Sequence, residues 1–407
     1  MKRFYYNTSI LLFFIFTILF VGCYKFSNEL DPDPDPEPNP EPHVNTYISS
    51  SKIKIIFSVA PELVNISIPP LKYNKDFCIG LHLDDGAEDI YTHAYQLLNG
   101  GKIDGLTYPG LSFTDGCGND IKFKMSTAIF SLDIDEIIDI HEPGLMNGFL
   151  TWPQIIEMYK SDWGVYNHGL TIDATIDHSY SIESNHNYVK SKTTDAFEGG
   201  INMKIFVNPD GDPTFSDYAF QQNYRISFVA GYEFCNPYFD ITNTWNKSNI
   251  KMGRTLLVSQ VNFSQLVDEV AELSINGSHY WMSTFTHSVT NNNWGYNFNM
   301  FKDHMTYIAN KYGKNGFDNI LMVSEEEMLD YCILKDLLVL NQNLNDNILE
   351  ITFSGNIPSD LRFYNTSLIL STNTTILSIE IEGASQSSSY NGINTNSSLI
   401  NINCNNL

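Results

Sequence analysis

The chain has 407 residues, which is enough for one large domain and a smaller one. Hydrophobic residues make up 43% of it and aromatic residues 13%, so most of the chain can bury a core and fold. The formal net charge of −24 argues against nucleic acids as partners, because their phosphates would be repelled.

The N-terminus has the pattern of an export signal. Two basic residues precede the apolar run 10–21, and Gly22 and Cys23 follow it. A cysteine directly after a small residue resembles a bacterial lipobox, although a plain membrane anchor is an alternative. We therefore predict a lipoprotein signal peptide over residues 1–22 and lipidation of Cys23.

The next segment, residues 23–47, is an acidic, proline-rich linker. Within it, Asp31–Pro42 alternates proline with mostly acidic residues, which prevents regular helix and sheet hydrogen bonding and gives a stiff, extended spacer. A lipid anchor followed by such a spacer predicts a folded part held at the cell envelope of a bacterium, on the outer membrane or the cell surface.

From residue 48 to residue 336, strand-like runs alternate with amphipathic helices, which favours an α/β fold with a mostly parallel barrel or sheet. The expected helices are Gln154–Tyr159, Phe263–Ile275, Met300–Tyr312 and Ser324–Leu334, and Ser181–Lys192 is a weaker candidate. The expected strands are Lys52–Ala60, Val64–Pro70, Phe77–Leu81, Ser126–Ile134, Trp163–Tyr166, Met203–Val207, Arg225–Ala230, Arg254–Val258 and His279–Phe285.

The pattern of the sequence changes after about Leu337, where helical periodicity ends. Short β-rich runs follow, separated by Asn, Ser, Thr and Gly. They predict a small C-terminal domain over residues 337–407 that is β-sandwich-like, with a role in packing or carbohydrate contact. The expected strands are Ile348–Phe353, Ser367–Ser371, Ile376–Ile381 and Ser398–Asn403.

Ionisable residues follow the predicted strands of the larger domain. Asp84 and Asp85 come after the first buried run, and His168, Asp210 and His287 come after later ones. The carboxyl ends of parallel strands meet on one side of a sheet or barrel, where ligands gather. Alternatives are an acidic turn at the two aspartates and a structural histidine at His287.

These residue types suit metal-assisted hydrolysis. A carboxylate and a histidine are ligands for Zn²⁺ or another divalent metal, which lowers the pKa of bound water to ~7. A second carboxylate can take the proton, and a histidine across the site can return it to the leaving amine. A backbone N–H near Asp210 or Gly211 can hold the oxyanion. Such a set would hydrolyse an amide or an ester.

The order of these strand ends resembles the polysaccharide deacetylase family, carbohydrate esterase family four with its NodB-homology domain. The resemblance covers about Lys72–Tyr331 and implies a distorted parallel (β/α) barrel. The segment His82-Leu83-Asp84-Asp85-Gly86 stands where the family has a Thr-Phe-Asp-Asp-type motif. The resemblance thus implies Asp84 as catalytic base and Asp85 as metal ligand, with His168 in the place of the first metal histidine and His287 as a second catalytic residue.

The sequence departs from the family pattern at two motifs. Ile172 occupies the position of the second metal histidine, so His186 is the preferred third ligand and His178 the alternative. The arginine that would hold the catalytic aspartate is missing from Val207–Gly211, which keeps one proline.

Two functions follow as hypotheses. The first is a surface-anchored, metal-dependent hydrolase that removes N-acetyl or O-acetyl groups from a carbohydrate, with Zn²⁺ as the favoured metal. Its partners would be an acetylated glycan and, through the lipid anchor, a membrane. The alternative is a catalytically inactive, glycan-binding lipoprotein on a deacetylase scaffold.

Overall fold

The computed structural model describes residues 48–133, 138–171, 175–230, 236–242, 247–290 and 295–404. The predicted signal peptide, Cys23, the acidic linker and Ile172 lie outside these ranges, so those predictions are not tested by it. Within the described ranges, no helix combines the length and the apolar character that a membrane crossing needs.

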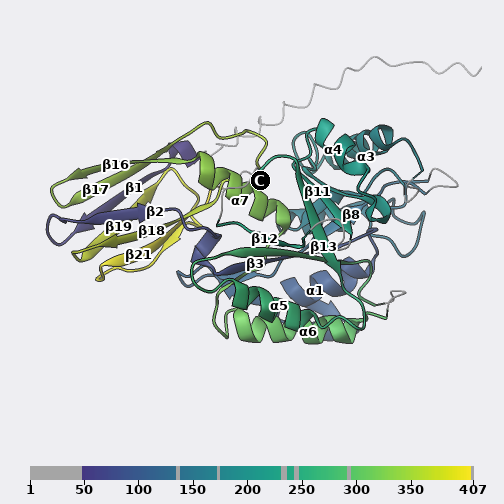
Figure 1. Ribbon diagram of the computed structural model, residues 1–407, viewed down its shortest axis with the longest axis horizontal. Coiled ribbons are helices and arrows are strands. Elements are labelled where there is room, and N and C mark those ends of the chain that lie inside the picture. The colour runs from purple at the N-terminus through teal and green to yellow at the C-terminus, as the bar shows by residue number, and fades with distance from the viewer. Residues whose placement is uncertain are drawn as a thin grey trace, which may run out of the picture. The chain divides into compact units, whose positions relative to one another are not determined.

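Seven parallel strands of the described chain close into a barrel, with each strand beside its sequence neighbours (Figure 1). The last strand, β14, pairs in parallel with the first, β3, and completes the ring. The predicted parallel (β/α) barrel is therefore confirmed. Its strands are β3 (Phe77–Leu83), β8 (Ser126–Ile129), β9 (Gly164–Asn167), β10 (Ile205–Val207), β11 (Ile226–Ala230), β13 (Ile250–Leu256) and β14 (Tyr280–Thr286).

Two short strands extend the barrel sheet. β12 (Tyr238–Asp240) pairs antiparallel with β14, and β15 (Ile320–Leu321) pairs in parallel with β3. Between β3 and β8 the chain forms two small hairpins that the sequence did not predict. The elements of that stretch are η3 (Ile90–Tyr95), α1 (Gln96–Asn99), β4 (Gly101–Ile103), β5 (Leu106–Tyr108), β6 (Ser112–Thr114) and β7 (Asp120–Lys122).

The predicted helices form close to their expected ranges. α2 begins with a proline in its first turn and a reciprocal capping box between Thr151 and Gln154, as its sequence favours. Ser324 caps α7 by accepting the Glu327 backbone N–H at 3.3 Å. The larger helices are α2 (Trp152–Lys160), α3 (His178–Thr193), α4 (Phe215–Gln221), α5 (Phe263–Leu273), α6 (Phe298–Tyr312) and α7 (Glu325–Leu337), and the short 3₁₀ turns are η1 (Ile48–Ser50), η2 (Lys72–Asn74) and η4 (Pro209–Gly211).

The C-terminal strands form a sandwich of two four-stranded antiparallel sheets within the described residues. Two strands that precede the barrel in the sequence, β1 and β2, also belong to this sandwich (Figure 1). One sheet has the order β16 (Val339–Asn345), β17 (Ile348–Ser354), β1 (Lys52–Phe57) and β19 (Ile376–Glu382), and the other has β2 (Val64–Ser67), β18 (Thr366–Thr372), β21 (Ser397–Ile402) and β20 (Ser389–Tyr390).

This pairing differs from the expected barrel boundary at residue 48, and the pattern of β1 gives the reason. Barrel strands such as β3 are buried along their whole length, whereas every second residue of β1 is buried. Ile53 and Ile55 face the sandwich core, while Lys52 on the other face lies 2.6 Å from Glu350. Strict alternation is typical of an antiparallel sheet with one solvated face.

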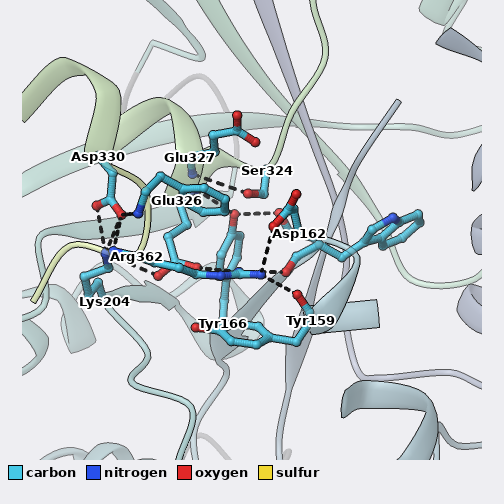
Figure 2. A network of polar contacts seen from close by, with 12 residues as sticks. Tyr159, Asp162, Tyr166, Lys204, Ser324, Glu326, Glu327, Asp330 and Arg362 are labelled. Carbon is cyan, nitrogen blue, oxygen red and sulfur yellow. Dashed lines mark hydrogen bonds and ion pairs between the residues drawn. The ribbon is translucent and has the colours of Figure 1, made fainter. Parts of the chain in front are cut away.

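A network of buried charges joins the first turn of α7 to both parts of the fold (Figure 2). Lys204 Nζ lies 2.7 Å from both carboxylate oxygens of Asp330 and 3.3 Å from Glu326 Oε1. Arg362, in the segment between β17 and β18, donates from Nη1 to Glu326 Oε2 and to the Trp163 carbonyl, both at 3.0 Å. The network therefore connects the sandwich to the barrel.

Arg362→Ala should destabilise the protein by about 3–5 kcal/mol, because it removes one partner from a buried ion pair and leaves its carbonyl acceptors without a donor. Urea unfolding measures the change. Arg225→Ala is the matched control, since Arg225 pairs with the exposed Asp360 at 2.8 Å and should contribute about 1 kcal/mol or less. Equal losses in the two variants would contradict the role given to the buried network.

Candidate metal and catalytic site

The two aspartates follow β3 with different exposures. Asp84 is 1% exposed, whereas the Asp85 side chain is 25% exposed. Asp85 has a φ of 69° and Gly86 a φ of 67°, both in the left-handed region, so the chain turns sharply here. A Cβ at residue 86 would lie 3.0 Å from the His141 ring, which makes glycine the residue that fits.

Asp84 forms a buried ion pair with an arginine from another strand. Arg254 of β13 is 2% exposed, and its Nη1 donates to Asp84 Oδ2 at 2.5 Å. Burial favours the neutral acid, but the Arg254 charge, helped by nearby histidines, lowers the pKa of Asp84 to about 2. Segment 207–211 has no arginine, and the arginine that pairs with Asp84 comes instead from β13, two barrel strands after β10.

His168 is oriented by the end of β10. Its Nδ1 lies 2.7 Å from the Val207 carbonyl, which can only accept a hydrogen bond, so Nδ1 carries the proton. Its Nε2 therefore points toward Asp85, 3.3 Å from Oδ1. A histidine whose second nitrogen donates to a carbonyl is in the tautomer that binds metals.

The close approach of Asp85 to His168 requires a positive charge between them. Burial alone would lower the pKa of His168, but the hydrogen bond to Asp85 and the charges of Asp84 and Asp85 raise it above its usual value. A proton can fill the gap, and so can a divalent cation. Two ligands of tetrahedral zinc are about 3.3–3.4 Å apart, given bond lengths near 2.0–2.1 Å. The 3.3 Å separation fits a metal bound by both residues.

His287 lies on the other side of Asp85. Its Nε2 is 3.9 Å from Asp85 Oδ2, and 27% of its side chain is exposed. This distance is longer than the edge of a zinc tetrahedron. His287 thus borders the Asp85–His168 pair from a partly exposed position.

An aspartate that the sequence did not reveal holds the loop after His287. Asp89 Oδ2 accepts the backbone N–H of Val289 at 3.0 Å and of Thr290 at 2.8 Å, and it also accepts the hydroxyls of Ser288 and Thr290. One carboxylate oxygen thus fixes the three residues that follow His287. The sequence around Asp89 did not indicate this role, because its partners are about 200 residues away in the chain.

The structure does not bring His186 or His178 to the two aspartates. His186 Nδ1 lies 2.8 Å from the Tyr224 hydroxyl, and its ring packs edge-on against that residue. His178 stacks on Phe215 with ring centroids 3.7 Å apart. Within the described ranges, no group of three or more His, Cys, Asp or Glu side chains is arranged to hold one metal ion. The predicted third ligand is therefore not provided by His186 in this structure.

The predicted oxyanion donors are also placed differently from expectation. Gly211 donates its backbone N–H to the Asn208 carbonyl at 3.0 Å, so this group is already used within the turn η4. The Asp210 side chain is exposed, and the ion pairs of Asp85 in the described part of the chain are with His168 and His287, not through Asp210. Asn208 itself holds the turn by donating from its amide to the Asp212 carbonyl at 2.7 Å.

Polar residues continue from Asp84 into the barrel interior. Arg254 Nη1 also lies 3.3 Å from His82 Nε2, and His82 Nδ1 lies 3.4 Å from Glu325 Oε2. Ser283 donates to the other Glu325 oxygen at 2.6 Å. His82 and Glu325 are both fully buried. Burial raises the pKa of Glu325 to about 8, although the Ser283 hydrogen bond and the Arg254 charge oppose the rise.

Asp89→Ala should free the loop after His287, because hydrogen bonds to a charged acceptor are worth about 1.5–3 kcal/mol each. We expect the amide protons of Val289 and Thr290 to exchange with solvent roughly 10–100-fold faster, measured by hydrogen exchange. Amides of β3 should keep their rates. Unchanged rates at both loop amides in the folded variant would show that Asp89 does not hold the loop.

Glu325 should make stability depend on pH. Its pKa is raised from 4.5 to about 8 in the folded state, so the fold holds this proton more tightly than the unfolded chain does. Its contribution is largest below about pH 4.5 and is lost as the pH rises through about 8, by at most about 5 kcal/mol. Between pH ~5 and ~9, urea unfolding should show the parent losing stability relative to Glu325→Gln. Parallel curves would exclude the raised pKa.

Comparisons with known proteins give only distant likenesses. No protein-family model matches the sequence, and no curated protein matches it. One similar solved structure is the Streptococcus pyogenes deacetylase PplD in complex with acetate, at 15% identity and a TM-score of 0.27, over 40% of this chain and 74% of that one. Another is the Xyl-CE4 domain of a multidomain xylanase from the hindgut metagenome of Trinervitermes trinervoides, at 14% identity and a TM-score of 0.33, over 61% of this chain and 88% of that one. One of these proteins is a deacetylase and the other is a CE4 domain. The fold of this chain is defined by its own closed barrel.

Proposed function

We propose that the protein is a metal-dependent hydrolase that removes N-acetyl or O-acetyl groups from a carbohydrate. One observation carries the proposal: Asp85 Oδ1 and His168 Nε2 face each other at 3.3 Å, directly beside a buried aspartate held ionised by Arg254. Metal ligands next to an ionised carboxylate at the carboxyl end of barrel strands are suited to the hydrolysis of an acyl group.

Asp85 and His168 would hold the metal, and Zn²⁺ suits this pair of oxygen and nitrogen ligands. Such a metal, when bound, polarises an acetyl carbonyl and lowers the pKa of water. The Val207 carbonyl keeps His168 in the binding tautomer through the hydrogen bond at 2.7 Å. Among the described residues, Asp85 and His168 would be the ligands, and water would complete the coordination.

Asp84 and His287 would handle protons on either side of the ligands. Asp84 stays ionised throughout the physiological range, so it can accept a hydrogen bond from the attacking water and orient it. A carboxylate with so low a pKa is a weak base, which makes the strength of the Arg254 contact important for the proton transfer. His287 is partly exposed beside Asp85 and would donate a proton to the leaving group.

The anchor and the location belong to the same proposal and rest on the sequence alone. The motivating pattern is the apolar run that ends at Gly22-Cys23, followed by the acidic spacer. A lipid on Cys23 would hold the barrel at the bacterial envelope, near glycans of the surface.

Acetate release from N-acetylated and O-acetylated oligosaccharides, with Zn²⁺ supplied, tests the activity. Asp85→Ala should lose both zinc binding and activity, whereas Arg254→Met should keep zinc binding and lose about 10²-fold in kcat/KM. Zinc titration separates the two. Asp346→Ala is the matched control, because Asp346 has a φ of 53° in an exposed turn and shares only the backbone conformation of Asp85. Equal acetate release by the parent and Asp85→Ala would overturn the metal mechanism.

A glycan-binding protein without activity is the second candidate, favoured by the number of ligands. A catalytic zinc site usually has three protein ligands, and Asp85 and His168 are two. A purified parent that takes up no divalent metal, releases no acetate and still retains oligosaccharides on a column would support binding over catalysis.

A further inference from the structure

The interior of the barrel contains a row of polar side chains beneath the candidate base. The row runs from Asp84 through Arg254 and His82 to Glu325, which enters from the first turn of α7. All four residues are at most 2% exposed. Barrel interiors are usually filled by branched apolar side chains, so four polar groups in one line need an explanation.

The hydrogen-bond directions along this row are fixed by chemistry. Arginine can only donate, so Arg254 Nη1 donates both to Asp84 Oδ2 and to His82 Nε2. His82 Nε2 is then the acceptor, and the ring proton sits on Nδ1. Burial and the Arg254 charge hold the pKa of His82 well below its usual range, so the ring is neutral. Its Nδ1–H is then the group that lies near Glu325, with Nδ1 3.4 Å from Oε2.

Glu325 lies beside that donor, and in the neutral form that its raised pKa favours, its unprotonated oxygen can accept the Nδ1–H. Its Oε2 lies 3.4 Å from His82 Nδ1, and neither atom has a hydrogen-bond partner in the part of the chain that the structure describes. Each atom is thus the nearest complementary group for the other, a donor beside an acceptor. Gly80 on β3 leaves room for this carboxylate, because a Cβ at that position would lie 2.5 Å from Glu325 Cγ.

We propose that His82 and Glu325 are positioning residues that hold Arg254 against Asp84 from inside the barrel. The aromatic rings around His82 support this role, since Phe228 packs edge-on against it with centroids 4.7 Å apart. Cζ of the Arg254 guanidinium lies 3.7 Å from the centre of the Phe285 ring, so one face of the guanidinium is covered. Its orientation within that plane is set by its hydrogen bonds. The link to acetyl hydrolysis rests on the proposed function, whereas the positioning of Arg254 does not.

The test measures how fast the Arg254 guanidinium rotates about its Cζ–N bonds, by ¹⁵N exchange spectroscopy. Arg254→Met assigns the signal. Arg362, which is buried with its own carbonyl and carboxylate acceptors, is the internal reference. In His82→Phe we expect rotation of Arg254 to be about 10-fold faster, because the hydrogen bond from Nη1 to His82 is lost, and rotation of Arg362 to be unchanged. Unchanged rotation of Arg254 in the folded variant would overturn the proposal.

Glu325 provides a second, independent pair of variants. Glu325→Gln keeps a carbonyl that can accept from His82 and should resemble the parent, whereas Glu325→Leu lacks the acceptor and should speed Arg254 rotation. Glu327→Gln is the matched control, since Glu327 lies in the same buried turn and pairs with Lys72 at 2.6 Å. Equal rotation rates in Glu325→Leu and Glu325→Gln would contradict the role of Glu325, even if His82→Phe fails to fold.

Enzyme activity is a further measurement, because a purely structural role of His82 and Glu325 would leave kcat of the folded variants unchanged. His82→Phe and Glu325→Leu should lower kcat about 10-fold at an unchanged zinc affinity, with Glu325→Gln restoring most of it. A parent that releases no acetate while Arg254 rotation still responds to His82→Phe would refute the proposed function and leave the positioning role intact. Lowered kcat with unchanged rotation would refute the positioning role alone.

Discussion

Burying the Asp84 carboxylate at the end of β3 requires a positive charge beside it, and Arg254 supplies that charge. An isolated carboxylate in such a place would take up a proton, because burial penalises the charged form. With Arg254 Nη1 at 2.5 Å, the carboxylate stays ionised, and the pKa of Asp84 is about 2. The side chains around the site are arranged to keep this one pair in place.

The same constraint explains why the barrel interior is polar. Arg254 has more donors than Asp84 can use, and a buried donor without an acceptor costs free energy. His82 accepts one of them, and its second nitrogen must then be matched in turn. Glu325 lies where that match is needed, and its burial raises its pKa to about 8, because the barrel interior disfavours a further ionised group. Each buried polar residue thus needs the next one as a hydrogen-bond partner, from Asp84 through Arg254 and His82 to Glu325 of α7.

The sequence was informative where a single segment carries the pattern and uninformative where the partners are distant. Asp84, Asp85, His168 and His287 were predicted from strand ends, and the structure brings them together. Arg254 was read only as the start of a strand, because nothing local distinguishes a lumen arginine from a surface one. The family pattern directed attention to segment 207–211, so a compensating residue on β13 was missed.

The sandwich also shows that a local sequence pattern does not reveal partners that are distant in the chain. The alternation in Lys52–Phe57 predicted a strand correctly, and its one solvated face was a sign that it does not belong to a barrel. Only the pairing of β1 with β17 and β19 shows which sheet it completes. β1 is one of the two inner strands of its sheet, and the other three strands follow the whole barrel in the sequence, so this sheet pairs the two ends of the described chain. Arg362 then joins the two parts, because it lies between β17 and β18 of the sandwich and donates to Glu326 of α7 and to the Trp163 carbonyl beside the barrel.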